Sequence, residues 1–140
     1  MAVNSYTPTK NYPSFSSVIN ETFPVVTKTT AGAVTYTAAE IISGLILRDT
    51  NGASRSDVTP SAADLLAAVE GAQVNSGFKF HIRNTADAAE TITMTAGTGI
   101  TISGTATIAQ NNGKNFLAVF TNVTSGSEAV TIYSLGTVVF

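Results

Sequence analysis

The stretch Phe78-Lys79-Phe80-His81-Ile82-Arg83 decides how the rest of the chain is interpreted. Aromatic and aliphatic side chains alternate in it with basic ones, and successive side chains of a β-strand point to opposite faces of the sheet. We therefore expect a half-buried strand over residues 78–83, with the apolar side chains in the core and the basic side chains toward solvent.

Further segments of this kind follow at regular intervals. Most alternate threonine with an aliphatic side chain, Gly- and Asn-rich turns separate them, and they cover residues 91–95, 100–103, 105–108, 116–121, 130–132 and 137–140. Strands spaced roughly 8–12 residues apart are typical of antiparallel sandwiches and barrels. The sequence thus predicts an all-β fold, an antiparallel sandwich or barrel of the jelly-roll type.

The residues before this stretch predict two more strands. Residues 34–38 alternate in polarity, and residues 41–47 form a denser apolar run that suits a strand buried on both faces. The second run ends in Arg48-Asp49-Thr50-Asn51-Gly52, where Asn-Gly is a strong turn signal.

One short helix is expected between residues 59 and 71. Thr59 can act as its N-cap and Pro60 as its first residue, where the missing N–H costs nothing. Leu65 and Val69 lie on one apolar face, and Gly71 ends the helix. We expect this helix to cover the core.

The first 30 residues differ from the rest of the chain. They contain three of the four prolines and, without any regular period, the aromatic residues Tyr6, Tyr12, Phe15 and Phe23. Prolines at this spacing interrupt both helices and strand pairing. We expect residues 1–30 to form an extended arm that contacts another chain, and residues 31–140 to form the β-rich domain. The alternative is an arm that wraps its own domain.

The composition of the chain, above all its few charged residues, excludes several classes of protein. Only 16 of 140 residues are charged, while threonine and serine occupy 35 positions. An apolar fraction of 44% with a net charge of −2 is unlike a disordered chain. Seven lysines and arginines provide no basic surface for nucleic acid, and the absence of cysteine excludes disulfides and thiolate metal sites.

No apolar run approaches the roughly 20 residues that a bilayer span requires, and the N-terminus lacks the apolar core of a signal peptide. We therefore expect a chain made in a cytoplasm, without a membrane partner. Its threonine-rich strand faces suit extensive contact with other proteins, because a hydroxyl is buried without desolvating a charge. The alternative is a threonine-rich domain with an inert surface.

The sequence contains little that supports catalysis. Its only histidine, His81, has basic residues two positions away on both sides, and a histidine acts as a base only beside a nucleophile or carboxylate. Gly97-Thr98-Gly99 lacks the third glycine of a dinucleotide motif, and Gly113-Lys114 lacks the first glycine of a phosphate-binding loop. We interpret both as turns, and we expect no enzyme activity, no cofactor and no small-molecule substrate.

The few charges gather in two places, which are the candidate subunit-interface residues. Four lie within ten residues around the predicted turn and three share the polar face of one strand: Arg48, Asp49, Arg55 and Asp57, then Lys79, His81 and Arg83. In a chain with so few charges, such groups can form salt bridges across a subunit boundary. The alternative for the first group is a solvated loop with exposed ion pairs of little energetic value.

Two stretches carry a resemblance to a known family. One runs from Tyr36-Thr37-Ala38-Ala39-Glu40 to Arg48-Asp49 and on to Thr59-Pro60-Ser61, and the other is Ile82-Arg83-Asn84-Thr85-Ala86-Asp87, with Ala96-Gly97-Thr98-Gly99 and Asn122-Val123-Thr124. Together they resemble small β-rich virion proteins of tailed bacteriophages, in particular capsid decoration (cement) proteins. The resemblance covers about residues 31–140 and leaves the arm unmatched.

This resemblance implies a homotrimer on the outer surface of an icosahedral head, assembled in the host cytoplasm, that clamps neighbouring major capsid subunits without cofactor or reaction. The arm would then be the part that grips the capsid, with its four aromatic side chains in pockets. Two alternatives stay open: a tail-fibre or spike module that binds a receptor, and another minor structural subunit of the virion.

Overall fold

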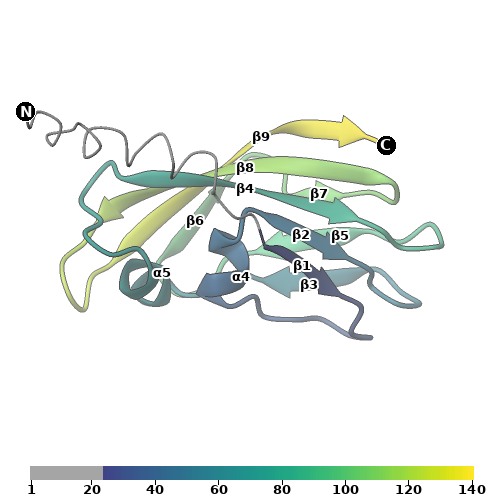
Figure 1. Ribbon diagram of the computed structural model, residues 1–140, viewed down its shortest axis with the longest axis horizontal. Coiled ribbons are helices and arrows are strands. Elements are labelled where there is room, and N and C mark those ends of the chain that lie inside the picture. The colour runs from purple at the N-terminus through teal and green to yellow at the C-terminus, as the bar shows by residue number, and fades with distance from the viewer. Residues whose placement is uncertain (1–23) are drawn as a thin grey trace, which may run out of the picture.

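The structure, a computed structural model, describes residues 24–140, in which nine strands form two sheets beside two short helices (Figure 1). The larger sheet has the order β1-β2-β4-β8-β9-β6, made by β1 (Val25–Lys28), β2 (Leu45–Arg48), β4 (Gly77–Asn84), β8 (Asn112–Asn122), β9 (Ala129–Val139) and β6 (Ile100–Ser103). The smaller sheet has the order β3-β5-β7, made by β3 (Arg55–Val58), β5 (Ile92–Thr95) and β7 (Thr107–Ile108). The described chain is mostly β, as predicted.

The strand directions differ from the prediction. Four strand pairs are parallel, β1–β2, β2–β4, β3–β5 and β6–β9, and three are antiparallel, β4–β8, β8–β9 and β5–β7. Both sheets are therefore mixed, and the expected antiparallel fold is wrong in this respect. Alternation of apolar and polar residues reports which face is buried and carries no information about the direction of the neighbouring strand.

One core joins the two sheets and both helices. The rings of Phe80 and Phe116 stack in it with centroids 5.0 Å apart, and Met94 of the smaller sheet and Leu65 of a helix belong to the same buried cluster. Neither sheet of the described chain closes into a barrel, so the barrel alternative is wrong.

Residues 78–83 lie in β4 and alternate between buried and more exposed side chains, as predicted. Phe80 and Ile82 of β4 are buried, whereas Lys79 is exposed and His81 and Arg83 are half-buried on the opposite face. Downstream, β8 and β9 are each eleven residues long, so β9 unites the two short strands expected over residues 130–132 and 137–140.

The first helix, α4 (Ala38–Ile42), lies where the sequence predicted strands. Thr37 caps it, because its side chain accepts from the Glu40 N–H while the Glu40 carboxylate accepts from the Thr37 N–H at 2.8 Å. Strand β2 begins only after Gly44, which has φ +95°. Residues 34–38 contribute a single bridge, between Thr35 and Val58.

The second helix, α5 (Ala62–Ala68), is the predicted one, but its cap is different. The Ser61 side chain accepts from the Asp64 N–H at 3.1 Å and is the N-cap. Thr59 is buried two residues earlier, where its hydroxyl accepts from the Gly97 N–H at 2.8 Å. Thr59 thus joins the helix entry to another loop, and Pro60 lies before the cap.

The boundary predicted between an arm and a domain at residue 30 lies too late in the chain. Strand β1 already belongs to the larger sheet, where it pairs in parallel with β2. The segment after it is also held: the Arg48 guanidinium donates to the carbonyl oxygens of Thr30 at 2.9 Å and Gly32 at 2.7 Å. The domain therefore includes residues from Val25 onward.

Candidate interaction surface

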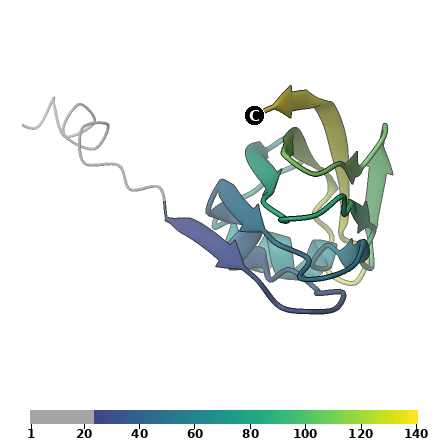
Figure 2. The same cartoon turned by 90° about the vertical axis from the view of Figure 1, so that its right-hand side faces the viewer.

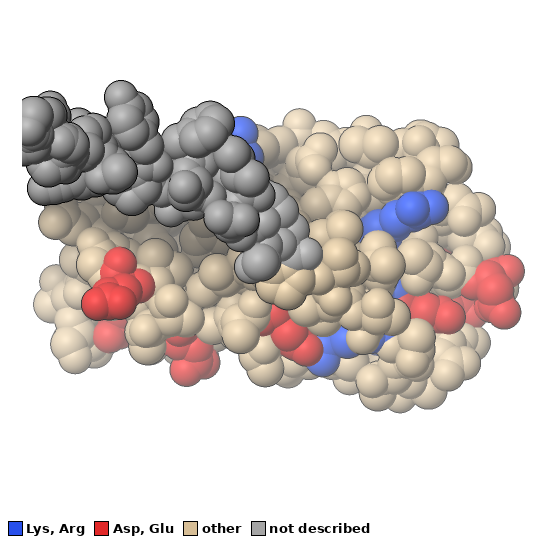
Figure 3. All heavy atoms as spheres, in the orientation of Figure 1, with Lys and Arg blue, Asp and Glu red and all other residues tan. Residues whose placement is uncertain are grey.

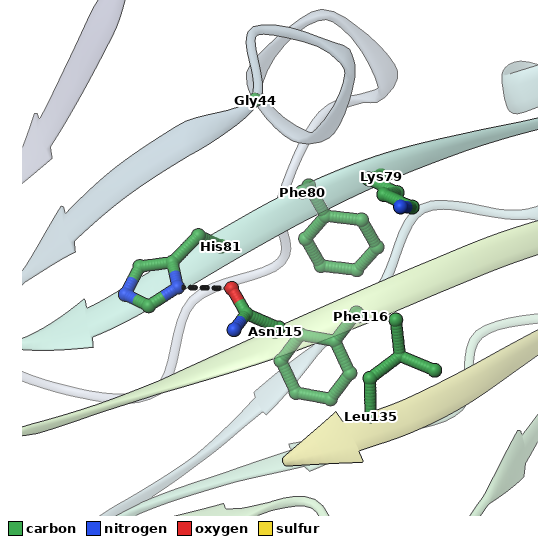
Figure 4. A pocket seen from close by; sticks show the side chains of 7 residues that line it. All are labelled: Gly44, Lys79, Phe80, His81, Asn115, Phe116 and Leu135. Carbon is green, nitrogen blue, oxygen red and sulfur yellow. Dashed lines mark hydrogen bonds between the residues drawn. The ribbon is translucent and has the colours of Figure 1, made fainter. Parts of the chain in front are cut away.

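The face of the larger sheet that points away from the core carries most of the predicted basic residues and a depression between its strands. A shallow depression of about 390 Å³ lies on it, between the start of β2, β4, β8 and β9 (Figure 4). It is lined by Gly44, Lys79, Phe80, His81, Asn115, Phe116 and Leu135. None of these seven residues has a carboxylate, hydroxyl or thiol, and Lys79 is the one residue among them that carries an amine.

His81 is fixed in this depression by its neighbours. Its Nδ1 donates to the Asn115 side-chain oxygen at 2.7 Å, and its ring meets the ring of Phe140 edge-on with centroids 5.9 Å apart. The Arg83 guanidinium carbon lies 4.0 Å from the centre of the Phe140 ring, as in a cation–π contact. His81 and Arg83 therefore position the residue that follows β9.

Gly113 makes this packing possible and is not the turn glycine that the sequence suggested. It lies in β8, opposite Arg83, and a Cβ atom built on it would lie 2.2 Å from His81 Nε2 and 2.7 Å from the Phe140 ring. Only a residue without a side chain leaves room for both rings. The turn itself precedes it, where Asn111 has φ +60° and the Asn112 N–H donates to the Ala109 carbonyl oxygen.

Large apolar side chains are exposed along the second half of β9 and just beyond it. Leu135 and Phe140 are each 52% exposed and Val139 is 76% exposed, with Tyr133 and Val138 beside them. In the view of Figure 3, most of the described surface carries neither acidic nor basic side chains. Apolar side chains are thus exposed at one strand, and the described part of the face in Figure 3 carries few charges.

Arg48 and Asp57, two of the predicted interface residues, lie in the interior instead. Both side chains have no exposed surface, and the Arg48 Nε–Asp57 Oδ2 distance is 2.7 Å. Tyr36 donates its hydroxyl hydrogen to the same carboxylate at 2.9 Å. An interface role is therefore wrong for this pair, because its own chain covers it completely.

The pair holds the turn and the chain entry together. Besides Asp57, Arg48 reaches three backbone carbonyl oxygens, so the buried guanidinium is paired and its N–H groups have acceptors. Burial, together with the neighbouring Asp57 carboxylate, raises the pKa of Tyr36 far above its usual value near 10, and the opposing effect of Arg48 is smaller.

Asp49 follows β2 at the start of the turn, Arg55 begins β3 just after it, and both are only half-buried. The Asp49 carboxylate accepts from the Asn51 N–H at 2.9 Å, a local turn contact, and Arg55 Nε lies 3.5 Å from the Thr50 carbonyl oxygen. The structure therefore separates the four charges of this cluster into a buried pair and two surface residues that a partner can reach. For those two residues the interface role stays a prediction.

A buried polar cluster near the end of β4 was missed in the sequence. The Asn84 side chain donates to the carbonyl oxygens of Glu90 at 2.9 Å and Ile108 at 3.0 Å, and the Thr50 hydroxyl bonds to the Glu90 carboxylate. The alternation of β4 contained the signal, because Asn84 continues the inward series of Phe80 and Ile82. The cluster joins loops of both sheets and is structural.

Other predicted features have no counterpart to test among the described residues. The arm residues Tyr6, Tyr12, Phe15 and Phe23 lie outside residues 24–140. Between residues 24 and 140, no group of three histidine or acidic side chains could hold a metal ion. In the same range no helix has the length and apolar character needed to cross a bilayer.

Comparison with known proteins adds no relative: the chain matches no family model, no curated protein and no solved structure.

Proposed function

We propose that this chain is a structural virion protein that decorates and stabilises an icosahedral phage head by clamping adjacent major capsid subunits. In this proposal it acts as a homotrimer on the outer capsid surface, without enzymatic activity or cofactor. Its domain would be a jelly-roll-like sandwich with mixed strand directions. The observation that carries the proposal is the exposed apolar surface at β9 on a molecule with few charges.

Exposed apolar surface of this kind is suited to contact with a partner. Soluble monomers rarely expose contiguous apolar patches larger than a few hundred Å², and such larger patches are commonly contact sites. Leu135, Val139 and Phe140 are each at least half-exposed on one strand end. The hydroxyl-rich surface around them can be covered by another protein without desolvating ions. A cement protein, which is enclosed between other subunits, has use for such a surface.

The residues before β1 supply the proposed grip on the capsid. Residues 1–23 contain Tyr6, Tyr12, Phe15 and Phe23 and precede the edge strand β1 in the sequence. An extended segment gains affinity by backbone pairing and by placing aromatic side chains in pockets. Three arms on one trimer raise each other's effective concentration. The bound trimer then stabilises the assembled shell by mass action.

Removal of residues 1–23 tests the proposed grip. Heads lacking the protein, taken from the phage that encodes it, are mixed with the full chain or with a chain starting at Pro24, and bound protein is measured after sedimentation. We expect the full chain to saturate the heads and the shortened chain to lose at least about tenfold in affinity. Equal occupancy by the two chains would refute the gripping arm.

Copy number in intact particles separates this proposal from its rivals. A cement protein occurs in hundreds of copies, whereas a tail-fibre or spike module occurs in a few to tens. Quantitative gel analysis of purified particles gives this number directly, and a count in the tens would favour the tail component.

A further inference from the structure

The larger sheet has two stretches of strand edge that no other strand of the described chain pairs. At one end, β1 has β2 as its only neighbour among the described strands. Near the other end, β6 pairs with β9 only from Val130 to Tyr133. The chain turns away at Gly104, which has φ +93° and lies against Ser134. Residues 135–139 of β9 therefore have β8 as their only described neighbour.

Unpaired backbone groups can be assigned on both edges. The Phe140 N–H donates to the Asn111 carbonyl oxygen at 2.9 Å, so by the alternation of antiparallel pairs Thr137 and Val139 direct their backbone groups away from β8. The Lys28 carbonyl oxygen accepts from the Asp49 N–H at 2.8 Å, so Thr27 directs its backbone groups away from β2. Each edge presents a short row of donors and acceptors.

The exposed apolar side chains gather on the same two edges. Seven large hydrophobic side chains of the described residues are exposed, and six belong to β1, to β9 or to the residue after β9: Val25, Tyr133, Leu135, Val138, Val139 and Phe140. Proteins normally protect unpaired edges with charges, prolines or covering loops. In residues 135–139 neither charge nor proline is present, so this edge is suited to pair with a strand.

We propose that copies of this chain join edge to edge, the second half of β9 in one copy pairing with β1 of the next. The two edges do not pair within one copy of the described chain, where β2, β4 and β8 lie between them in an open sheet (Figure 2). β1 and β9 run in the same direction in the sheet. A rotation about an axis along the strands therefore brings them together as a parallel pair, and we propose that its repetition closes a ring, as a head-to-tail contact does when its rotation divides the full turn.

Charges at the ends of the two strands are complementary in this arrangement. At the end of β1, Lys28 forms a salt bridge with Glu40 at 2.8 Å, and Asp49, whose N–H bonds to Lys28, adds an acidic side chain that forms no salt bridge with a described residue. Arg83, stacked on Phe140, places a basic side chain at the end of β9, and its buried Nε has no hydrogen-bond partner among the described residues. Parallel pairing puts these two ends at the same level, where opposite charges favour the register.

This contact goes beyond the proposed function, because it requires only that the chain associates with itself. The number of copies in the ring, three, rests on the proposed function. Molecular mass and head binding are separate measurements, so either proposal can fail alone.

Proline substitutions test the two edges. Thr137→Pro and Thr27→Pro each remove one N–H that points to a free edge, while Thr137→Ala and Thr27→Ala keep it and serve as matched controls. Mass is measured by analytical ultracentrifugation of the full chain. We expect a trimer for the wild type and both alanine variants, and about one third of that mass for both proline variants, with unchanged circular dichroism.

Mixing the two proline variants tests the head-to-tail arrangement. Each variant keeps one intact edge, so an equimolar mixture forms one β9–β1 contact and stops at the dimer. If Thr137→Pro fails to fold, Val139→Lys places a charge on the same edge at a side chain that is 76% exposed and is expected to lower the mass likewise. A monomeric wild type, trimeric proline variants, or a mixture that stays monomeric would overturn the proposal.

Discussion

Arg48 illustrates how one buried charge organises this domain. Its guanidinium reaches Asp57 and the carbonyl oxygens of Thr30 and Gly32, and the Val34 N–H donates to the same carboxylate at 3.0 Å. The residues that connect β1 to α4 are thereby attached to β2 and β3. Buried ion pairs are stable only when all their groups have partners, and this pair meets that condition within its own chain.

Tyr36 makes the stability of the domain sensitive to high pH. Its pKa is raised in the fold by burial and by Asp57, so above pH 10 the unfolded chain loses this proton while the folded chain keeps it. The contribution of Tyr36 to the stability of the domain is therefore fully present below pH 10, and it is lost as the pH rises beyond that value. We expect Tyr36 to lower the free energy of unfolding by about 1.4 kcal/mol per pH unit there.

Denaturant unfolding of the wild type and Tyr36→Phe at several pH values between 8 and 11.5 measures this effect. The phenylalanine variant loses the hydroxyl and has a shallower slope above pH 10, although it is less stable at pH 8 because the bond to Asp57 is gone. Parallel slopes for the two proteins would contradict the assignment to Tyr36.

At the scale of elements, the two helices depend on caps more than on length. α4 has five residues and α5 has seven, so neither is stable without its tertiary contacts and caps. Thr37 and Glu40 form the T-x-x-E capping box, and this signal was visible in a segment whose apolar run favoured a strand. Local capping outweighed the pattern of hydrophobic residues.

We expect Ser61→Ala to destabilise the domain by about 1 kcal/mol, because the Asp64 N–H loses its acceptor at the start of α5. Urea unfolding followed by circular dichroism measures the change. Ser125→Ala, in the exposed loop before β9, serves as the control and should stay within about 0.5 kcal/mol of the wild type. Similar losses of unfolding free energy in both variants would show that the Ser61 cap stabilises the domain no more than an exposed serine does.

At the scale of the whole molecule, the position of β1 determines where the domain can be cut. A chain that starts at Pro24 keeps β1 and the acceptors of Arg48, so we expect it to unfold cooperatively with about the stability of the full chain. A chain that starts at Ala31 lacks β1 and the Thr30 carbonyl oxygen. It should lose at least about 2 kcal/mol, the cost of exposing one edge and leaving a buried donor unpaired.

Urea denaturation of the two shortened chains beside the full chain makes the comparison. If both shortened chains matched the full chain in midpoint and slope, β1 would not be part of the cooperative unit, and the boundary predicted at residue 30 would stand. Head binding by the chain that starts at Pro24 can be interpreted only after its fold has been established in this way.

Much of the strand content followed from the sequence because alternation reports burial directly. The inward series Phe80, Ile82 and the outward series Lys79, His81, Arg83 lie as predicted, and so does the helix around Leu65. The candidate interface was predicted less well. Arg48 and Asp57 share a charged turn with Asp49 and Arg55 in the sequence, yet only the fold decides that the first two face each other inside.

The sequence by itself determined the β-rich character, the faces of the strands and the scarcity of charge, because these depend on local patterns of polarity. Only the tertiary structure decided the strand directions, the burial of Arg48 with Asp57 and the exposure of Leu135, Val139 and Phe140 on an unpaired edge. Each of these depends on which distant segments lie side by side, and a local pattern of polarity does not encode that choice.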